Sequence, residues 1–312
     1  KLLGTVSDGD IRRVLLNGLT LDDCIEPIIF HNPTVCSVDD TKEDILRIAV
    51  ENKIYQIPIV DQSGVLVGID VIDDLLAPRE YENKVVLMVG GLGSRLRPLT
   101  NDLPKPLLEV GNKPILETII SNFAKYGFKN IILSVNYKSQ MIENYFGDGS
   151  SLGVSIEYIH EDKRMGTAGA LSLIKDKLSE PFFVMNGDLL TNVNFEHMLE
   201  FHLKNESIAT MSVRKYDFQI PYGVVSIEDH NITKIEEKPF QTCYVSGGIY
   251  ILDTDVLSYI PDNSYYDMPT LFEKLIESKQ KTVSFPIREY WLDIGRISDF
   301  EQANSEYNGV FN

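Results

Sequence analysis

The hydrophobic pattern from residue 84 onward alternates between the periods of strands and helices. Short apolar runs typical of buried strands lie at residues 84–89, 130–135, 154–160 and 182–188. Apolar residues recur at helical spacing in residues 114–127, 139–147 and 167–178. We expect a meander of strands over about 207–252 and a closing helix over 297–307. This alternation predicts an α/β domain with a mostly parallel sheet.

Two segments in the first 80 residues share a second pattern. Residues 2–15 and 65–76 each read as a short apolar strand, a glycine and an acidic turn that opens a helix. A helix is expected over 41–54 and a strand over 56–61. This repeat predicts a small α+β module, and the proline and charges of residues 75–84 predict a linker after it.

Charge narrows the classes of partner. The 312 residues carry a formal net charge of −17, and residues 1–83 hold 7 Lys and Arg against 16 Asp and Glu. This acidity argues against nucleic acid or an anionic membrane as a partner. No apolar run reaches the ~18 residues of a membrane span, and three cysteines without metal-ligand spacing predict reduced thiols in the cytoplasm. The first residue is Lys1, which indicates a fragment.

One loop is rich in cations although the chain as a whole is acidic. Residues 90–106 (GGLGSRLRPLTNDLPKP) contain three glycines and three cations, namely Gly90, Gly91, Gly93, Arg95, Arg97 and Lys105. The glycines allow backbone N–H groups to approach phosphate oxygens, and the cations supply charge. A P-loop would need Gly-Lys-Ser/Thr here, and a dinucleotide fingerprint would need glycine at Leu96. The loop predicts a site for a triphosphate.

The segment GGLGSRLRPLTNDLPKPLLEVGNKPILE (90–117) resembles the signature of the sugar-1-phosphate nucleotidyltransferase family, with Ser94 where the family prefers Thr. The resemblance implies a Rossmann-like, glycosyltransferase A-type domain over residues 83–312. It also implies a reaction in which a nucleoside triphosphate and a sugar 1-phosphate give a nucleotide sugar and pyrophosphate. The sugar phosphate is already an anionic nucleophile, so catalysis must come from alignment and charge neutralisation. On this resemblance Arg95 holds the pyrophosphate part and Lys105 the α-phosphate.

The resemblance also implies Mg²⁺, a cation that prefers carboxylates and phosphate oxygens, held by Asp188 and Asp293. Asp188 taken alone would read as a helix cap or turn residue. The expected nucleotide-binding residues are Gly90, Gly91, Gly93, Ser94, Gly166, Thr167 and Gly169. The last three belong to residues 165–171, which in this family lie along the base and otherwise read as a helix start.

For the sugar phosphate, the matching segments are residues 222–225 and 236–239, followed by 245–250. Glu237 should meet sugar hydroxyls and Lys238 the sugar phosphate. The implied residues are Gly223, Glu237, Lys238, Ser246 and Gly248. Ser246 stands where asparagine is common in the family, so the usual sugar contact changes.

Residues 1–79 resemble the end of one CBS repeat and a complete second repeat. CBS modules work in pairs and often bind adenosine nucleotides through a Gly-x-x-Ser/Thr-x-x-Asp turn. Gly4, Ser7 and Asp10 match that turn, whereas Val71 replaces the hydroxyl residue in the second copy. Ser7 and Asp10 are therefore the candidate ligand residues. The other reading is a module that only packs and dimerises, and either reading predicts a homo-oligomer.

A CBS pair joined to such a transferase resembles the glucosamine-1-phosphate guanylyltransferases of legionaminic acid synthesis and other enzymes of surface polysaccharide synthesis. We therefore expect GTP and glucosamine 1-phosphate. Mannose or heptose 1-phosphate, and thymidylyl or uridylyl transfer, stay open. A glycosyltransferase would carry Asp-x-Asp where Asn186, Gly187 and Asp188 stand. A nucleotide-sensing protein with an inert transferase domain is the remaining alternative, because the module at 1–79 could be the working part.

Overall fold

The computed structural model describes residues 1–18, 20–76 and 79–311, and these fall into two compact units, Lys1–Pro78 and Arg79–Asn312. The division falls inside the linker predicted at 75–84, of which Ala77 and Pro78 lie outside the described residues. Within the described ranges no helix combines the length and apolarity that crossing a bilayer requires.

The first unit is built on three strands, β1 (Cys36–Ser37), β2 (Gln56–Val60) and β3 (Leu66–Val71). β2 lies between a parallel β1 and an antiparallel β3. The helices are α1 (Asp8–Leu16), α2 (Lys42–Glu51) and α3 (Ile72–Leu76). The core is small, with Cys36, Ile45, Ala49, Ile57, Ile59 and Leu75 buried. The strand predicted within 2–15 is wrong, because its described backbone forms only an isolated bridge between Thr5 and Phe30.

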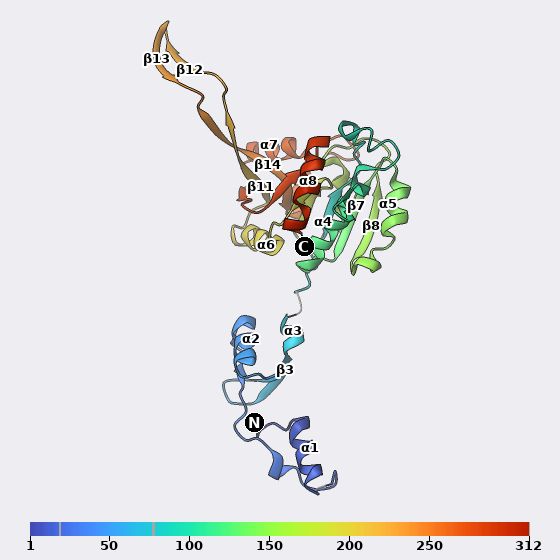
Figure 1. Cartoon of the computed structure of the whole chain (residues 1–312), viewed down its shortest axis with the longest axis vertical. Helices are drawn as coiled ribbons and strands as arrows, with labels where there is room; N and C mark the ends of the chain where they lie inside the picture. Colours follow the sequence, from blue (N-terminus) through green and yellow to red (C-terminus); the bar gives the residue numbers. More distant parts are fainter. Residues whose placement is uncertain (19, 77–78, 312) are drawn as a thin grey trace. The chain divides into compact units, whose positions relative to one another are not determined.

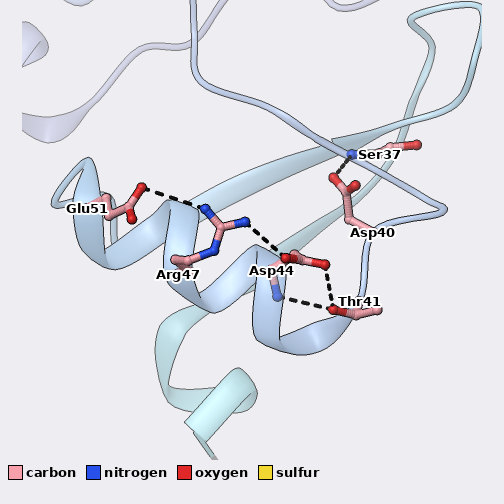
Figure 2. Close-up of polar contacts among 6 residues, drawn as sticks. All are labelled: Ser37, Asp40, Thr41, Asp44, Arg47 and Glu51. Atoms are coloured by element: carbon pink, nitrogen blue, oxygen red, sulfur yellow. Dashed lines mark hydrogen bonds and ion pairs between the residues drawn. The ribbon is translucent and has the colours of Figure 1, made fainter.

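Polar side chains fix the start of α2 (Figure 2). The Thr41 Oγ1 accepts a hydrogen bond from the Asp44 N–H at 3.2 Å, which satisfies a free helix donor. The Asp44 carboxylate in turn pairs with Arg47, whose Nη2 lies 2.9 Å from Oδ1. One turn earlier, Asp40 accepts the Ser37 N–H at 2.7 Å. These contacts explain why the helix predicted over 41–54 begins at residue 42.

The second unit contains a seven-stranded sheet in the order β15-β11-β14-β9-β4-β7-β8. Its strands are β4 (Val85–Met88), β7 (Asn130–Val135), β8 (Ser155–His160), β9 (Phe182–Asn186), β11 (Ala209–Gln219), β14 (Phe240–Leu252) and β15 (Thr282–Pro286). β9, β4, β7 and β8 run parallel, and β14 is antiparallel to both of its neighbours. The predicted mostly parallel α/β fold is confirmed.

Successive residues of the central strands enter two cores, one on each face of the sheet. Val85 and Leu87 belong to one core and Val86 to the other, as period-two alternation requires. The first core includes side chains of α4 (Ile115–Lys125), α5 (Ser139–Phe146), α6 (Phe195–Lys204) and α8 (Ile297–Val310). The second includes α7 (Met268–Glu277). Burial on both faces explains the continuous apolar runs in the sequence.

The helix predicted over 167–178 is wrong. The chain there forms two 3₁₀ turns, Gly169–Leu173 and Lys175–Lys177. The N–H groups of Ala168 and Gly169 both donate to the Tyr266 carbonyl, at 2.9 Å each, which ties the segment to the loop before α7. The Ser172 hydroxyl also donates to the Gly169 carbonyl at 2.7 Å. These hydrogen bonds replace the i to i+4 backbone bonds of an α-helix. The apolar residues of the segment therefore lie on 3₁₀ turns instead.

Three two-stranded ribbons complete the unit. They are β5 (Glu109–Val110) with β6 (Lys113–Pro114), β10 (Leu189–Thr191) with β16 (Trp291–Asp293), and β12 (Val224–Glu228) with β13 (Asn231–Glu236). The last belongs to a long projection, here called the arm (residues 214–245), in which β11 and β14 continue beyond the sheet toward β12 and β13 (Figure 1). The predicted strands over 207–252 are therefore confirmed, although their outer halves lie outside the sheet.

Candidate active site

A cavity of about 470 Å³ opens at the carboxyl ends of the parallel strands. Met88 and Asn186 line it from the ends of β4 and β9, and Asn136 and Glu161 from the residues just after β7 and β8. Ligands bind at this edge of open α/β sheets. The full lining consists of Met88, Gly90, Gly91, Leu92, Gly93, Ser94, Arg95, Leu96, Lys105, Asn136, Glu161, Arg164, Met165, Gly166, Thr167, Asn186, Asp188, Tyr265 and Gly295.

The glycine-rich loop forms one wall of the cavity. Gly93 adopts a left-handed conformation (φ 61°), and a Cβ there would lie 2.9 Å from Thr100 Cγ2. The Thr100 hydroxyl donates to the Gly93 carbonyl at 2.8 Å, so the loop is closed on itself. Gly90 lies close to Asn136 and Glu161, where a Cβ would be 3.1 Å from atoms of each. Six predicted residues of this loop line the cavity, namely Gly90, Gly91, Gly93, Ser94, Arg95 and Lys105.

Lys105 and Asp188 form an ion pair in the lining of the cavity. Lys105 is buried in a 3₁₀ turn between two prolines, and its Nζ lies 2.5 Å from Asp188 Oδ2. Asp188 follows β9 and precedes β10, so the end of a central strand positions it. The pair leaves an ammonium and a carboxylate at the same point of the cavity wall.

Asp293 lies beside Asp188 because β10 and β16 pair. Leu189 is opposite Asp293 in the antiparallel register, and the Ile294 N–H donates to the Asp188 carbonyl at 3.0 Å. Although Asp293 keeps an exposed surface, the protein atoms around its carboxylate and then the Asp188 charge raise its pKa. Lys105 and Arg95 act in the opposite direction. The pairing thus creates a repulsive carboxylate pair beside two cations.

This carboxylate pair fits a hard divalent cation that also binds substrate phosphates. Among the described residues, this site included, no group of three or more His, Cys, Asp and Glu side chains is arranged to hold a metal, so the two carboxylates alone do not make a complete metal site. Mg²⁺ commonly uses one or two carboxylates and completes its coordination with water and phosphate oxygens. Two neighbouring carboxylates beside a triphosphate-sized cavity therefore provide a chemically suitable donor set.

Residues 164–167 form another part of the cavity lining, and this segment is anchored to the start of α7. The Asp267 carboxylate accepts hydrogen bonds from the Thr167 N–H at 3.0 Å and its hydroxyl at 3.3 Å. The Thr167 hydroxyl, whose proton is used in the bond to Asp267, also accepts a hydrogen bond from the Met268 N–H at 2.8 Å. Gly166 (φ 74°) lines the cavity, and a Cβ there would lie 2.6 Å from Asp267 Oδ1.

The structure does not bring Gly169 to the cavity lining. A Cβ at Gly169 would lie 2.3 Å from the Ser264 carbonyl oxygen, so the glycine is required for close packing. Its predicted contact with the nucleotide remains a prediction. Thr167 does line the cavity, with its hydroxyl occupied by the α7 start.

The predicted sugar-phosphate residues divide into two groups. Gly223, Glu237 and Lys238 lie on the exposed arm and do not line the cavity. Gly223 and Glu237 are neighbours there, since a Cβ on the glycine would lie 3.0 Å from Glu237 Oε2.

Ser246 and Gly248 lie at the root of the arm, near the cavity but outside its lining. Gly248 (φ 69°) packs against Asn186, where a Cβ would approach the side-chain nitrogen to 2.9 Å. The Ser246 hydroxyl is 2.9 Å from the Tyr250 hydroxyl. Of the predicted sugar-phosphate residues, those at the root of the arm thus lie closer to the cavity in the fold than those on the arm itself, and none of them lines it.

In the first unit, Ser7 and Asp10 form the capping box of α1. Ser7 Oγ donates to Asp10 Oδ2 at 2.6 Å, and the Ser7 N–H reaches the same oxygen at 2.9 Å. Arg13 pairs with the other carboxylate oxygen. These contacts with Ser7 lower the pKa of Asp10. Both side chains are engaged within the helix start, and binding of an adenosine nucleotide remains a prediction.

Sequence reasoning missed several lining residues, among them Asn136, Glu161, Arg164, Tyr265 and Gly295. Asn136 and Glu161 had a usable signal, because each is the polar residue that directly follows a predicted strand. Tyr265 had none, since it lies about 100 residues from Gly166 in sequence. Arg95 packs beside Gly295, where a Cβ would lie 3.5 Å from the Arg95 Nη1.

Family comparisons match both units. A nucleotidyl transferase family model matches residues 84–309, and a CBS domain model matches residues 25–76. The chain is 37% identical over 237 residues to a mannose-1-phosphate guanyltransferase of Yarrowia lipolytica, covering 72% of this chain and 64% of that protein. It is also 37% identical over 229 residues to mannose-1-phosphate guanyltransferase beta-A of Xenopus laevis, covering 70% and 62%. The chain thus spans less than two thirds of the length of these relatives.

A solved structure resembles the second unit. It is HddC from Yersinia pseudotuberculosis complexed with GMP-PN, with a TM-score of 0.58 and 26% identity. The match covers 72% of this chain and 99% of that one.

Proposed function

The chain belongs to the nucleotidyl transferase family, and on that premise we propose that it joins a nucleoside triphosphate to a sugar 1-phosphate with release of pyrophosphate. The observation that carries this proposal is the cavity wall that contains Arg95, Lys105 and Asp188, with Asp293 outside the lining but beside Asp188 on the paired strand. Such a wall combines cations for a triphosphate with ligands for a divalent cation.

The proposed reaction is an in-line displacement at the α-phosphorus. A phosphate oxygen of the sugar 1-phosphate forms the new P–O bond, and the bond from the α-phosphorus to the β-phosphate oxygen breaks. Pyrophosphate leaves with that electron pair. Since the nucleophile is already an anion, the protein needs no general base and contributes alignment and charge neutralisation. Lys105 would neutralise the α-phosphate and Arg95 the departing pyrophosphate.

Asp188 and Asp293 would hold Mg²⁺, which supplies charge neutralisation for the phosphates. The Lys105–Asp188 pair supports this assignment, because it places an ammonium directly at the carboxylate that would hold the cation. On binding, the Lys105 ammonium is free to turn from the carboxylate to a phosphate oxygen.

For the base we propose guanine and for the sugar mannose 1-phosphate. The named relatives are mannose-1-phosphate guanyltransferases, and the HddC structure contains GMP-PN. Glucosamine 1-phosphate, expected from the combination with a CBS module, is the other sugar to be tested. We assign the reaction to the cytoplasm, where the free thiols of Cys24, Cys36 and Cys243 would stay reduced.

The test is product identification by mass spectrometry. Four nucleoside triphosphates are each incubated with mannose, glucosamine, glucose and heptose 1-phosphates in the presence of Mg²⁺. We expect a guanosine diphosphate sugar as the main product, with mannose favoured. A product with another base or sugar corrects the substrate assignment. A folded protein that forms no nucleotide sugar in any combination contradicts the proposed activity.

A further inference from the structure

One part of the active-site lining is built from two segments that lie far apart in the sequence. Residues 164–167 line the cavity, and Tyr265 joins them from the loop before α7. Backbone hydrogen bonds tie the two segments together, from the Tyr266 N–H to the Met165 carbonyl and from the Ala168 N–H to the Tyr266 carbonyl, at 2.9 Å each. Residues 164–167 and Tyr265 are here called the paired wall.

The paired wall is the part of the cavity that suits a nucleobase. The glycine-rich loop, Arg95 and Lys105 supply the backbone N–H groups and the cations that suit a triphosphate. A nucleotide with its phosphates there extends its base to another part of the same cavity. The paired wall offers two planar groups, the Arg164 guanidinium and the Tyr265 ring, and the base is the planar part of a nucleotide.

Asp267 holds both segments of the paired wall. The Tyr265 hydroxyl donates to Asp267 Oδ2 at 2.5 Å, and the Thr167 N–H donates to Oδ1 of the same carboxylate at 3.0 Å. Tyr265 is nevertheless 62% exposed, so ring surface stays open at the cavity that this residue lines. An exposed aromatic ring that is fixed at its hydroxyl end provides a surface on which a nucleobase can stack.

Arg164 adds a positive charge beside this ring. The hydrogen bond to Asp267 raises the pKa of the Tyr265 hydroxyl, and the charge of Arg164 acts in the opposite direction, so the two side chains are close. Arg164 is exposed and lines the cavity. Among the residues that the structure describes, none forms an ion pair with its guanidinium, which leaves the N–H donors for a ligand.

A guanidinium in the base wall distinguishes guanine from the other bases. Guanine presents two neighbouring acceptors, O6 and N7, along one edge, and two parallel N–H groups of an arginine match them. Adenine presents N7 beside an amino group, which is itself a donor, and a pyrimidine has no N7. Neither of these can accept both hydrogen bonds.

We propose that Arg164 and Tyr265 recognise the base of the nucleoside triphosphate in this cavity. The Tyr265 ring stacks on the base, and the Arg164 guanidinium donates hydrogen bonds to O6 and N7 of guanine. Tyr265 therefore contributes affinity for any base, whereas Arg164 determines which base is used. The proposal rests on the proposed function, because it takes GTP as the nucleotide of that site.

Equilibrium binding of GTP and 7-deaza-GTP, measured by calorimetry without a sugar phosphate, tests the role of Arg164. The analogue has a carbon in place of N7, so the wild type should bind it about tenfold more weakly than GTP. Arg164→Met should bind the two nucleotides with equal Kd. Lys163→Met is the matched control, because Lys163 is the adjacent exposed cation and lies outside the lining. This control should keep the tenfold difference.

The same two nucleotides test the role of Tyr265. Tyr265→Ala should weaken the binding of both by about tenfold and leave the ratio of their Kd values unchanged, because stacking does not require N7. Tyr145→Ala is the control. Tyr145 is also exposed and its hydroxyl also donates to a carboxylate, that of Glu117, but it does not line the cavity. Its removal should leave both Kd values unchanged.

Two results would overturn the recognition of guanine by Arg164. One is equal binding of GTP and 7-deaza-GTP by the wild type, and the other is an unchanged ratio in Arg164→Met. Binding by Tyr265→Ala as tight as that by Tyr145→Ala would overturn the stacking. The product assay separates this inference from the proposed function. A wild type that forms a nucleotide sugar but fails the binding comparison refutes the recognition alone, whereas one that passes the comparison but forms no nucleotide sugar supports the recognition and refutes the activity.

Discussion

The ammonium of Lys105 lies 2.5 Å from the carboxylate of Asp188, and Asp293 lies on the strand paired beside it. Lys105 therefore offsets repulsion between two neighbouring carboxylates before any substrate binds. This contact links the stability of the second unit to its proposed chemistry.

Lys105→Met should lower the free energy of unfolding, because it leaves Asp188 and Asp293 without a buried cation. Asp188→Asn in the same chain should recover part of the loss, with a coupling of about 1–3 kcal/mol. Urea unfolding of the wild type, both single variants and the double variant measures this coupling. Additive effects of the two substitutions would contradict it. Activity should stay lost in all three variants.

Gly166→Ala should destabilise the protein by roughly 1–3 kcal/mol, because the position has positive φ and no space for a Cβ. Gly91→Ala is the matched control, since Gly91 also lines the cavity but has nothing within 4 Å of its Cβ position. Thermal unfolding should separate the two variants. Equal melting temperatures would show that the close contact at Gly166 relaxes freely.

Asp267→Ala should weaken nucleoside triphosphate binding, because it releases the Thr167 segment from the start of α7. We expect KM for the triphosphate to rise by about tenfold, the equivalent of one or two lost hydrogen bonds, with a smaller change for the sugar phosphate. Asp262→Ala removes an exposed carboxylate paired with Lys175 and serves as the control. Equal effects on both substrates would contradict an anchoring role specific to the nucleotide wall.

Stability should depend on pH through His202. Burial lowers the pKa of this imidazole from 6.5 to about 4, although Asp253 acts in the opposite direction. The unfolded chain therefore binds a proton at higher pH than the folded chain does. The stability that neutral His202 contributes is present above pH 6.5 and is lost as pH falls toward 4, by about 3 kcal/mol in all.

The variant His202→Gln tests this pH dependence, because it keeps polar atoms near Thr210 and Ser207 and does not titrate. Urea unfolding at pH 7, 6 and 5 should show a smaller loss of stability in the variant than in the wild type. The comparison uses the slope with pH, since the substitution itself changes packing. If the free energy of unfolding falls with pH equally in the wild type and in the variant, the assignment of this pH dependence to His202 is contradicted.

Local chemistry explains which features could be predicted from the sequence. The apolar runs at β4, β7 and β9 are buried on both faces, so their strands follow from composition alone. Gly93 has the positive φ that its own loop requires, and Asp188 lies two residues after a central strand. Features of this kind depend on neighbours in the sequence.

Features set by distant contacts escaped prediction. The 3₁₀ turns after Ala168 depend on the Tyr266 carbonyl, which lies about 100 residues away. Tyr265 enters the cavity through the same loop and carries no motif. The separation of Lys238 from the cavity follows from the length of the β11–β14 ladder, and residue patterns report strand pairing without reporting the direction of the projection.

Pyrophosphate release from GTP and mannose 1-phosphate is the most direct test of the central claim. It is measured with and without Mg²⁺, for the wild type, for Asp188→Asn, and for Asp176→Asn as an exposed control outside the cavity. We predict Mg²⁺-dependent release by the wild type and the control, and a rate about 10²–10³-fold lower for Asp188→Asn. Release by Asp188→Asn at the wild-type rate, or equal release without Mg²⁺, would contradict the assignment of this cavity as the site of nucleotidyl transfer.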